Sequence, residues 1–159
     1  LGLTLIAYLL PFVMSVSALS LGKKDVTWRL KGWQALSLDV HAVVQQLPKP
    51  QQTFILSPLR KYASEIAFYM PGHPVTYKWS GNPSQRSSQY DLWPGPSDKL
   101  GWDALIVFNS NQRLPASLIN CFADVVDLGE RSVDIGAAGK RRYHLWRAEK
   151  LIRWPGEKN

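Results

Sequence analysis

Residues 53–72 read TFILSPLRKYASEIAFYMPG, and this stretch decides the fold class. Thr53 to Leu56 is a short apolar run of β-prone residues, which is typical of a buried strand. Ser57-Pro58 offers an N-cap followed by proline at the first helical position. We therefore expect a helix from Leu59 to Met70, which ends before Pro71-Gly72. A strand followed at once by a helix is the rhythm of an α/β domain with a parallel sheet.

The segments on both sides continue this alternation. Apolar residues at helical spacing predict a helix within residues 28–46, which stops at Leu47-Pro48. Further expected elements are strands at 75–79, 104–108, 122–128 and 142–148, a short helix at 114–120, a turn at 136–139, and short extended structure at 89–96 that runs into a turn. The sequence thus predicts one soluble α/β domain, residues 23–159, with a mostly parallel or mixed sheet flanked by helices.

Composition limits the classes of function. Of 159 residues, 19 are basic and 12 acidic, so the net charge is +7. This excess favours an anionic partner such as lipid headgroups, a phospholipid-linked substrate or nucleic acid. The seven Trp residues suit either a core or a surface that meets sugar or lipid headgroups. The only cysteine, Cys121, lies in an apolar context and is expected to be a small buried hydrophobe.

The N-terminal segment predicts a transmembrane helix, residues 1–22. Gly2 to Leu21 contains no charged side chain, and about 20 apolar residues cross a bilayer core of ~30 Å. The chain opens at Leu1 without Met or a basic n-region, which favours the last span of a larger membrane protein. The alternatives are a signal peptide cleaved near Val16-Ser17-Ala18 and a buried core helix. Lys23-Lys24 would place the domain in the cytoplasm by the positive-inside rule.

Metal and cofactor motifs are missing from the sequence. The three histidines have no partner at metal-ligand spacing, and there is no His-Glu-x-x-His, Cys-x-x-Cys or glycine-rich phosphate loop. We therefore predict no metal and no cofactor in this chain. The start of the helix after Ser57 could still meet an anion, with Arg60 and Lys61 nearby. The simpler interpretation is a capped helix with solvated charges.

The stretch from Arg86 to Asp103 is the densest in polar and aromatic residues. Loops carry a large share of binding residues, and carboxylates beside aromatic rings suit carbohydrate, whose hydroxyls bond to the acid and whose CH face packs on the ring. The alternative is that these acids form turns and face solvent. The candidate substrate-lining residues are Arg86, Gln89, Tyr90, Asp91 and Trp93.

Residues 141–147 mix basic and aromatic side chains, which is one signal of nucleic-acid binding. Their alternation is instead a strand pattern with one face directed inward. Beside a membrane span, anionic lipid explains the charge more simply. We therefore predict membrane lipid as a partner and no nucleic acid.

A set of segments in order carries a family resemblance. After the apolar span come LKGWQAL at 30–36, FIL at 54–56, YASEIAFYMPG at 62–72, SQYDLW at 88–93 and GWDALIV at 101–107. This set resembles the C-terminal part of bacterial membrane glycosyltransferases, relatives of the dolichyl-phosphate-mannose protein mannosyltransferases and the aminoarabinose lipid A transferases. It covers most of the chain, although no single segment is a strict signature.

The resemblance implies an enzyme that moves a sugar from a polyprenyl-phosphate donor to a lipid, protein or glycan acceptor. In this family an Asp-Glu pair in the first extracytoplasmic loop does the catalysis, often with a divalent metal near the donor phosphate. That half is not in this chain, so no catalytic residue is assigned and the fragment alone is expected to be inactive. The resemblance implies that the domain lies on the periplasmic or outer face of the bacterial inner membrane. This differs from the cytoplasmic side that Lys23-Lys24 would indicate by the positive-inside rule.

The alternative function is non-enzymatic. A membrane-anchored or secreted α/β domain that binds glycan or anionic lipid would show the same basic, Trp-rich composition. The two functions differ in whether further membrane helices precede Leu1.

Overall fold

The computed structural model describes residues 26–81 and 88–155. Its elements run in the order η2 (Val26–Leu30), α2 (Trp33–Gln46), η3 (Pro50–Gln52), β1 (Thr53–Ser57), α3 (Arg60–Tyr69), β2 (Thr76–Lys78), η4 (Gln89–Asp91), η5 (Pro96–Lys99), β3 (Asp103–Phe108), α4 (Ala116–Ile119), β4 (Phe122–Asp134), η6 (Gly136–Ala138) and β5 (Lys140–Leu151), where η denotes a 3₁₀ helix. None of the helices in these two ranges is long and apolar enough to cross a bilayer. The predicted span, residues 1–22, lies outside them.

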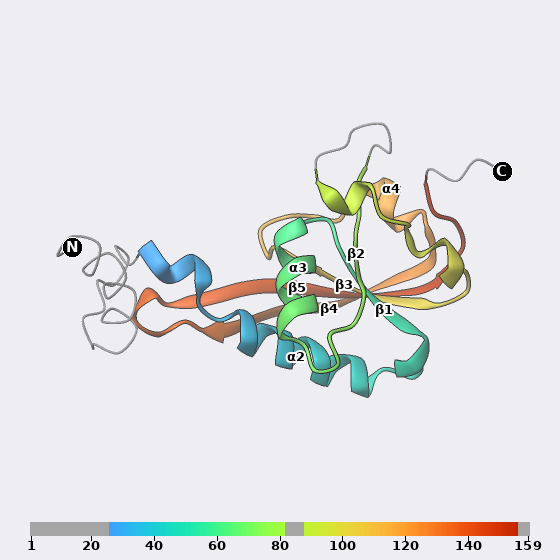
Figure 1. Cartoon of the computed structure of the whole chain (residues 1–159). Coiled ribbons are helices and arrows are strands. Elements are labelled where there is room, and N and C mark those ends of the chain that lie inside the picture. Colours follow the sequence, from blue (N-terminus) through green and yellow to red (C-terminus); the bar gives the residue numbers. More distant parts are fainter. Residues whose placement is uncertain (1–25, 82–87, 156–159) are drawn as a thin grey trace.

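The five strands form one mixed sheet in the order β2-β1-β3-β5-β4 (Figure 1). β1 pairs in parallel with β2 and β3, whereas β5 is antiparallel to both β3 and β4. The expected α/β class with a mixed sheet is thus confirmed. The chain leaves β1 through α3 to reach β2 and then returns past β1 to β3. The crossover from β1 to β2 and the crossover from β2 to β3 run in opposite directions across the sheet and pass over opposite faces. The two crossovers therefore have the same hand.

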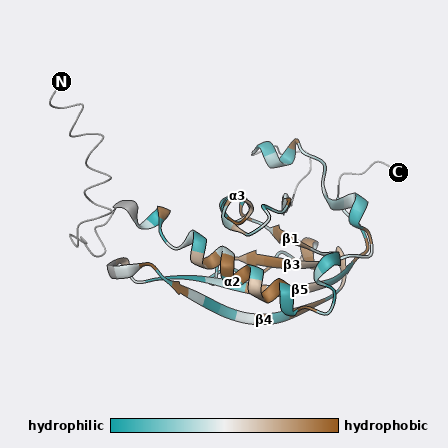
Figure 2. Cartoon of the chain, turned by 60° about the horizontal axis from the view of Figure 1, so that its bottom comes forward, coloured by the Kyte–Doolittle hydropathy of each residue, from teal (hydrophilic) through white to brown (hydrophobic). Residues whose placement is uncertain are grey.

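Two apolar clusters sandwich the sheet. On one face α2 and α3 contribute Trp33, Leu36 and Ile66, which pack on β1, β3 and β5. On the other face the connections and α4 contribute Trp79 and Leu118. Strands β1 and β3 are covered on both faces and are therefore apolar along their length, as Figure 2 shows, whereas β4 is mostly hydrophilic. The charges and the bulge of this edge strand discourage pairing with other chains.

Two details correct the sequence predictions. Ser57 does not cap α3, because it pairs with Lys78 as the last residue of β1 and its hydroxyl accepts a hydrogen bond from the Leu59 amide at 3.1 Å. The helix therefore begins at Arg60, with Leu59 as its N-cap residue. Residues 89–96 are not extended but begin with η4, whose amides are held by a capping box. β4 and β5 are also longer than expected, because the two strands pair with each other along their whole length.

Polar contacts attach the β4–β5 hairpin to the N-terminal elements. The buried guanidinium of Arg141 donates to the carbonyl oxygens of Trp28, Arg29 and Lys31 at 2.8 to 3.2 Å. Tyr143 donates its hydroxyl to Asp39 of α2 at 2.6 Å. The hairpin thereby fixes η2 and α2 against the sheet.

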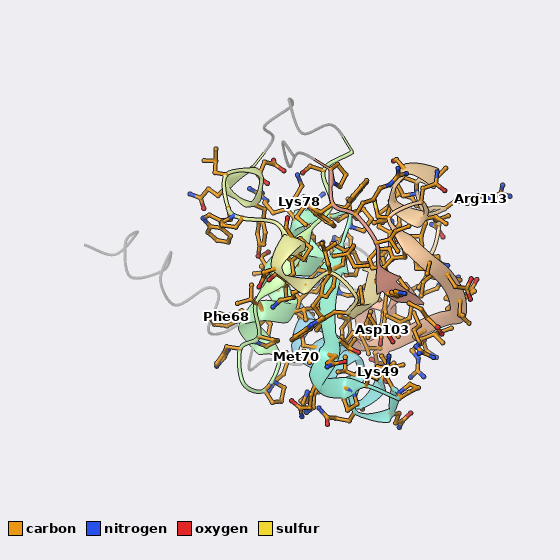
Figure 3. The ribbon with its side chains drawn as sticks, turned by 90° about the vertical axis from the view of Figure 1, so that its right-hand side faces the viewer. Lys49, Phe68, Met70, Lys78, Asp103 and Arg113 are labelled. Atoms are coloured by element: carbon orange, nitrogen blue, oxygen red, sulfur yellow. The ribbon has the colours of Figure 1, made fainter. Side chains whose placement is uncertain are left out.

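The carboxyl ends of the parallel strands lie together at one edge of the sheet. In Figure 3, Lys78 at the end of β2 and Arg113 after β3 lie at the upper end of the molecule, away from Lys49 before β1 and Asp103 at the start of β3. In open α/β sheets, ligands bind in crevices outside the carboxyl ends of the strands. This edge is therefore where a functional site is expected.

Candidate functional site

Two pockets adjoin this edge. The first, with a volume of ≈ 850 Å³, lies between β2, the segment from η4 to η5 and the C-terminal residues, and is the candidate site. The second, of ≈ 780 Å³, lies between the loop after β3, α4 and the β4–β5 hairpin. The first pocket is lined by Val75, Thr76, Tyr77, Lys78, Trp79, Ser80, Tyr90, Asp91, Trp93, Pro94, Gly95, Ser97, Asp98, Trp154 and Pro155.

A buried ion pair joins β2 to η4 at the first pocket. Lys78 Nζ lies 2.8 Å from Asp91 Oδ1, and only 9% and 4% of the two side chains is exposed. Ser80 bridges the pair, since its hydroxyl donates to Asp91 and accepts from Lys78. The other carboxylate oxygen accepts the Ser88 amide at 2.7 Å. Asp91 is thus held by several donors and fixes the loop, which leaves it poorly suited to act as a catalytic base.

The rim of the pocket carries an aromatic pair, a half-buried Tyr90 and an exposed Trp93. The ring centroids of Tyr90 and Trp93 are 4.9 Å apart with an interplanar angle of 57°. Trp93 is 58% exposed although it is a large apolar side chain. Because the capping box places η4 directly before it, this ring is presented on a defined support.

A second aromatic pair closes the inner side of the pocket. Trp79 and Trp154 meet edge to face, with ring centroids 5.1 Å apart. Gly95 permits this packing, because a Cβ there would lie 2.6 Å from Trp154 Cδ1. Trp79 is only 3% exposed, and its indole nitrogen has no hydrogen-bond acceptor among the described residues. A buried indole N–H normally finds a partner, so this unsatisfied donor is an unusual feature of the inner wall of the pocket.

Polar groups complete the lining. Burial raises the pKa of Tyr77, an effect that Lys99 opposes and Asp98 reinforces, so the phenol remains a neutral donor near pH 7. Ser97 and Asp98 add a hydroxyl and an exposed carboxylate. The combination of aromatic faces with a few hydrogen-bonding groups is that of a binding pocket for a small polar molecule with apolar faces.

The second pocket contains a histidine–carboxylate pair. His144 Nε2 contacts Asp127 Oδ1, and the imidazole stacks on Trp146 with centroids 4.1 Å apart. The hydrogen bond from His144 is the main cause of the lowered pKa of Asp127, and the Gly129 amide adds to it. No hydroxyl or thiol is hydrogen-bonded to this imidazole in the described ranges, so the arrangement lacks the nucleophile of a triad.

In the part of the chain that the structure describes, no three His, Cys, Asp or Glu side chains gather in a way that could hold a metal ion. Cys121 is buried, and its thiol lies 3.2 Å from the Ser117 carbonyl oxygen. Burial raises its pKa, which keeps it a thiol, in agreement with its predicted role as a small hydrophobe.

The structure brings together part of the predicted site. Tyr90, Asp91 and Trp93 line the first pocket, whereas Gln89 is exposed outside its lining. Arg86 lies outside the described residues. Asp103, at the far end of the same polar stretch, is buried at the start of β3 and pairs with a β5 arginine.

Sequence reasoning missed the other lining residues, among them Lys78, Trp79 and Trp154. Lys78 ends a short strand and Trp79 follows it, and a basic–aromatic pair at the carboxyl end of a parallel strand was the available signal. Nothing local distinguishes Trp154, which reaches the pocket because the chain leaves β5 beside Trp102, just before the start of β3, and then packs against Trp79.

Comparison of the chain with protein-family models, with curated proteins and with solved structures yields no match.

Proposed function

We propose that this chain is the extracytoplasmic domain of a polyprenyl-phosphate-dependent membrane glycosyltransferase, and that its first pocket binds a sugar of the donor or acceptor. In this proposal the transfer itself takes place in a membrane-embedded part of the parent protein. The domain contributes binding and orientation, since the described pockets contain no nucleophile activated by an adjacent base.

The observation that carries the sugar-binding proposal is the pairing of an exposed ring with a buried, unsatisfied donor. Trp93 presents a flat apolar face at the rim, and the Trp79 indole N–H has no acceptor among residues 26–81 and 88–155. A pyranose offers both complements, a CH face for the ring and hydroxyl oxygens for the donor. The hydroxyls of Ser97 and Tyr77 add further hydrogen-bonding groups.

Saturation-transfer NMR with methyl glycosides, using the full chain in detergent, tests this proposal. We expect transfer to the CH protons of at least one pyranose, and a loss of affinity of about tenfold in Trp93→Ala, since stacked aromatic contacts contribute up to about 1.5 kcal/mol. Trp79→Phe removes the N–H donor and should weaken binding further. Phe68→Ala is the matched control, because Phe68 is exposed on α3 and lines neither pocket.

Equal affinity in wild type and Trp93→Ala, with both proteins folded, would refute the sugar site. Asp91→Asn distinguishes an effect on the fold of the loop from an effect on ligand binding. It removes the charge that holds Lys78 but keeps the shape of the side chain. We expect it to loosen η4 rather than to remove a ligand contact.

The transferase part of the proposal has its own test. The native coding sequence upstream of Leu1 should encode further apolar spans and an Asp-Glu pair in the first loop. A start codon within a few residues of Leu1 would contradict the transferase and favour an anchored or secreted glycan-binding domain.

A further inference from the structure

The surface around η2 differs from the two pockets. Two large apolar side chains of η2 are exposed, Trp28 at 41% and Leu30 at 72%. Arg29 in η2 and Lys61 in α3 are exposed beside them. Figure 1 places η2 beside the turn of the β4–β5 hairpin, at the opposite end of the molecule from α4. We call Trp28, Arg29, Leu30 and Lys61 the η2 surface.

Cations gather around the two indole rings of this region. The Arg29 guanidinium lies 5.8 Å from the Trp28 ring centroid, and Lys61 Nζ lies 6.0 Å from it. Lys61 Nζ is also 4.8 Å from the Trp33 ring, over which the Arg141 guanidinium stacks at 3.9 Å. Cation–π contacts hold these side chains in place without neutralising their charge.

The positive charge of the η2 surface lacks a close counterion. Across residues 26–81 and 88–155, no carboxylate lies within ion-pair distance of Arg29 or Lys61. Burial lowers the pKa of Lys61, repulsion from Arg141 and Arg29 lowers it further, and Glu65 opposes these effects. Like charges held together in this way are stabilised by an external anion.

We infer that the η2 surface docks on an anionic membrane, with Trp28 and Leu30 in the interfacial region and Arg29 and Lys61 against lipid phosphates. Trp prefers the headgroup level of a bilayer, and cationic residues beside it bind anionic lipid. The surface also lies where the chain enters the domain, since η2 begins at Val26 and the uncharged stretch Gly2 to Leu21 precedes it.

This inference concerns how the domain lies on the membrane and does not depend on the sugar pocket. A free phosphate would not account for the exposed Leu30, and a neutral apolar partner would not account for the basic pair. An anionic bilayer accounts for both features, because its acyl chains are apolar and its lipid headgroups are negatively charged.

The test uses the full chain reconstituted in nanodiscs of phosphatidylcholine, with or without about 30% phosphatidylglycerol. Brominated lipids quench tryptophans at the interface. The difference between wild type and Trp28→Phe isolates the Trp28 signal from the other six indoles. The difference between wild type and Trp93→Phe gives the matched signal of an exposed indole outside the η2 surface.

We expect the Trp28 signal to be quenched more strongly in anionic than in neutral nanodiscs, and the Trp93 signal to remain unquenched in both. The double variant Arg29→Gln/Lys61→Gln should lower the ratio of docked to undocked domain by about fivefold per charge. The double variant Lys49→Gln/Lys150→Gln, which removes the same charge elsewhere, should change the ratio little.

Two results would overturn the inference. A Trp28 signal that is unquenched in both lipids would show that the η2 surface faces away from the bilayer, as it would if it bound an acidic protein. Equal quenching in both lipids would show that attachment alone brings Trp28 to the membrane and that the basic pair contributes nothing.

Discussion

The side chain of Arg141 offers the sharpest test of how η2 is held. Arg141 is 7% exposed, and its guanidinium donates to the carbonyl oxygens of Trp28, Arg29 and Lys31. Replacement by alanine removes every one of these donors and the stacking on Trp33. We expect Arg141→Ala to release η2 from the hairpin while the sheet stays folded.

The magnitude follows from these contacts. Hydrogen bonds from a charged donor contribute about 1.5–3 kcal/mol each, so three carbonyls and the cation–π contact give a gross loss of roughly 5–10 kcal/mol. Several kcal/mol return, because the buried guanidinium no longer has to be desolvated and its repulsion with Lys61 disappears. We therefore expect a net loss of about 2–4 kcal/mol in the free energy of unfolding. Arg141→Lys should lose about half as much, since an ammonium reaches fewer carbonyls.

Urea unfolding measures the total effect, and amide hydrogen exchange locates it. The amides of η2 should lose protection, whereas those of β1 and β3 should exchange at rates set by global stability. Arg142→Ala is the control, because its side chain is 68% exposed and its ion pair with Glu130 has an N···O distance of 3.9 Å. It should cost less than about 0.5 kcal/mol. A loss below that value for Arg141→Ala, or unchanged exchange in η2, would refute the reasoning.

Two further predictions concern titratable contacts of the hairpin. Tyr143→Phe should lower the free energy of unfolding by about 1–2 kcal/mol, because Asp39 loses a charge-assisted hydrogen bond but keeps its arginine partner, and urea unfolding checks this. Burial is the main cause of the raised pKa of Tyr143, and the hydrogen bond to Asp39 adds to it. The contribution of the Tyr143 phenol to stability is therefore present below its pKa in the unfolded chain, near 10, and is lost as the pH rises above that value. An ultraviolet titration should show that this phenol ionises only when the protein unfolds. The pKa of Asp127 is lowered chiefly by His144, so its contribution is present above the unfolded value near 3.8 and is lost as the pH falls below it. His144→Phe keeps a ring over Trp146 and should return the carboxyl pKa toward its ordinary value in an NMR titration; an unchanged pKa would show that the Gly129 amide is the main cause.

Much of the fold could be predicted from local patterns. The apolar runs of β1 and β3 indicated strands covered on both faces, and the helical spacing of apolar residues indicated α2 and α3. One of two local errors had a readable signal. Ser88 to Asp91 carries the S-x-x-D pattern of a capping box, which predicts the start of a helix rather than extended structure. Ser57 is a residue type that caps helices, yet its pairing with Lys78 keeps it in β1.

The candidate site was predicted only in part, because its members come from distant segments. The polar-aromatic composition of the stretch from Arg86 to Asp103 indicated Tyr90, Asp91 and Trp93, and these do line the pocket. The composition could not show that Asp91 forms an ion pair with Lys78 of β2. This ion pair makes Asp91 a structural residue of the pocket instead of a ligand contact.

The sequence by itself determined the alternation of strands and helices, the two-sided burial of β1 and β3 and the basic, Trp-rich character of the chain, because each of these follows from residue types at short spacing. Only the tertiary structure decided the antiparallel return of β5, the meeting of Trp79 with Trp154 and the capture of η2 by Arg141. These features depend on which distant surfaces pack together, and a partner 75 or 110 residues away leaves no periodic trace in the segment that it contacts.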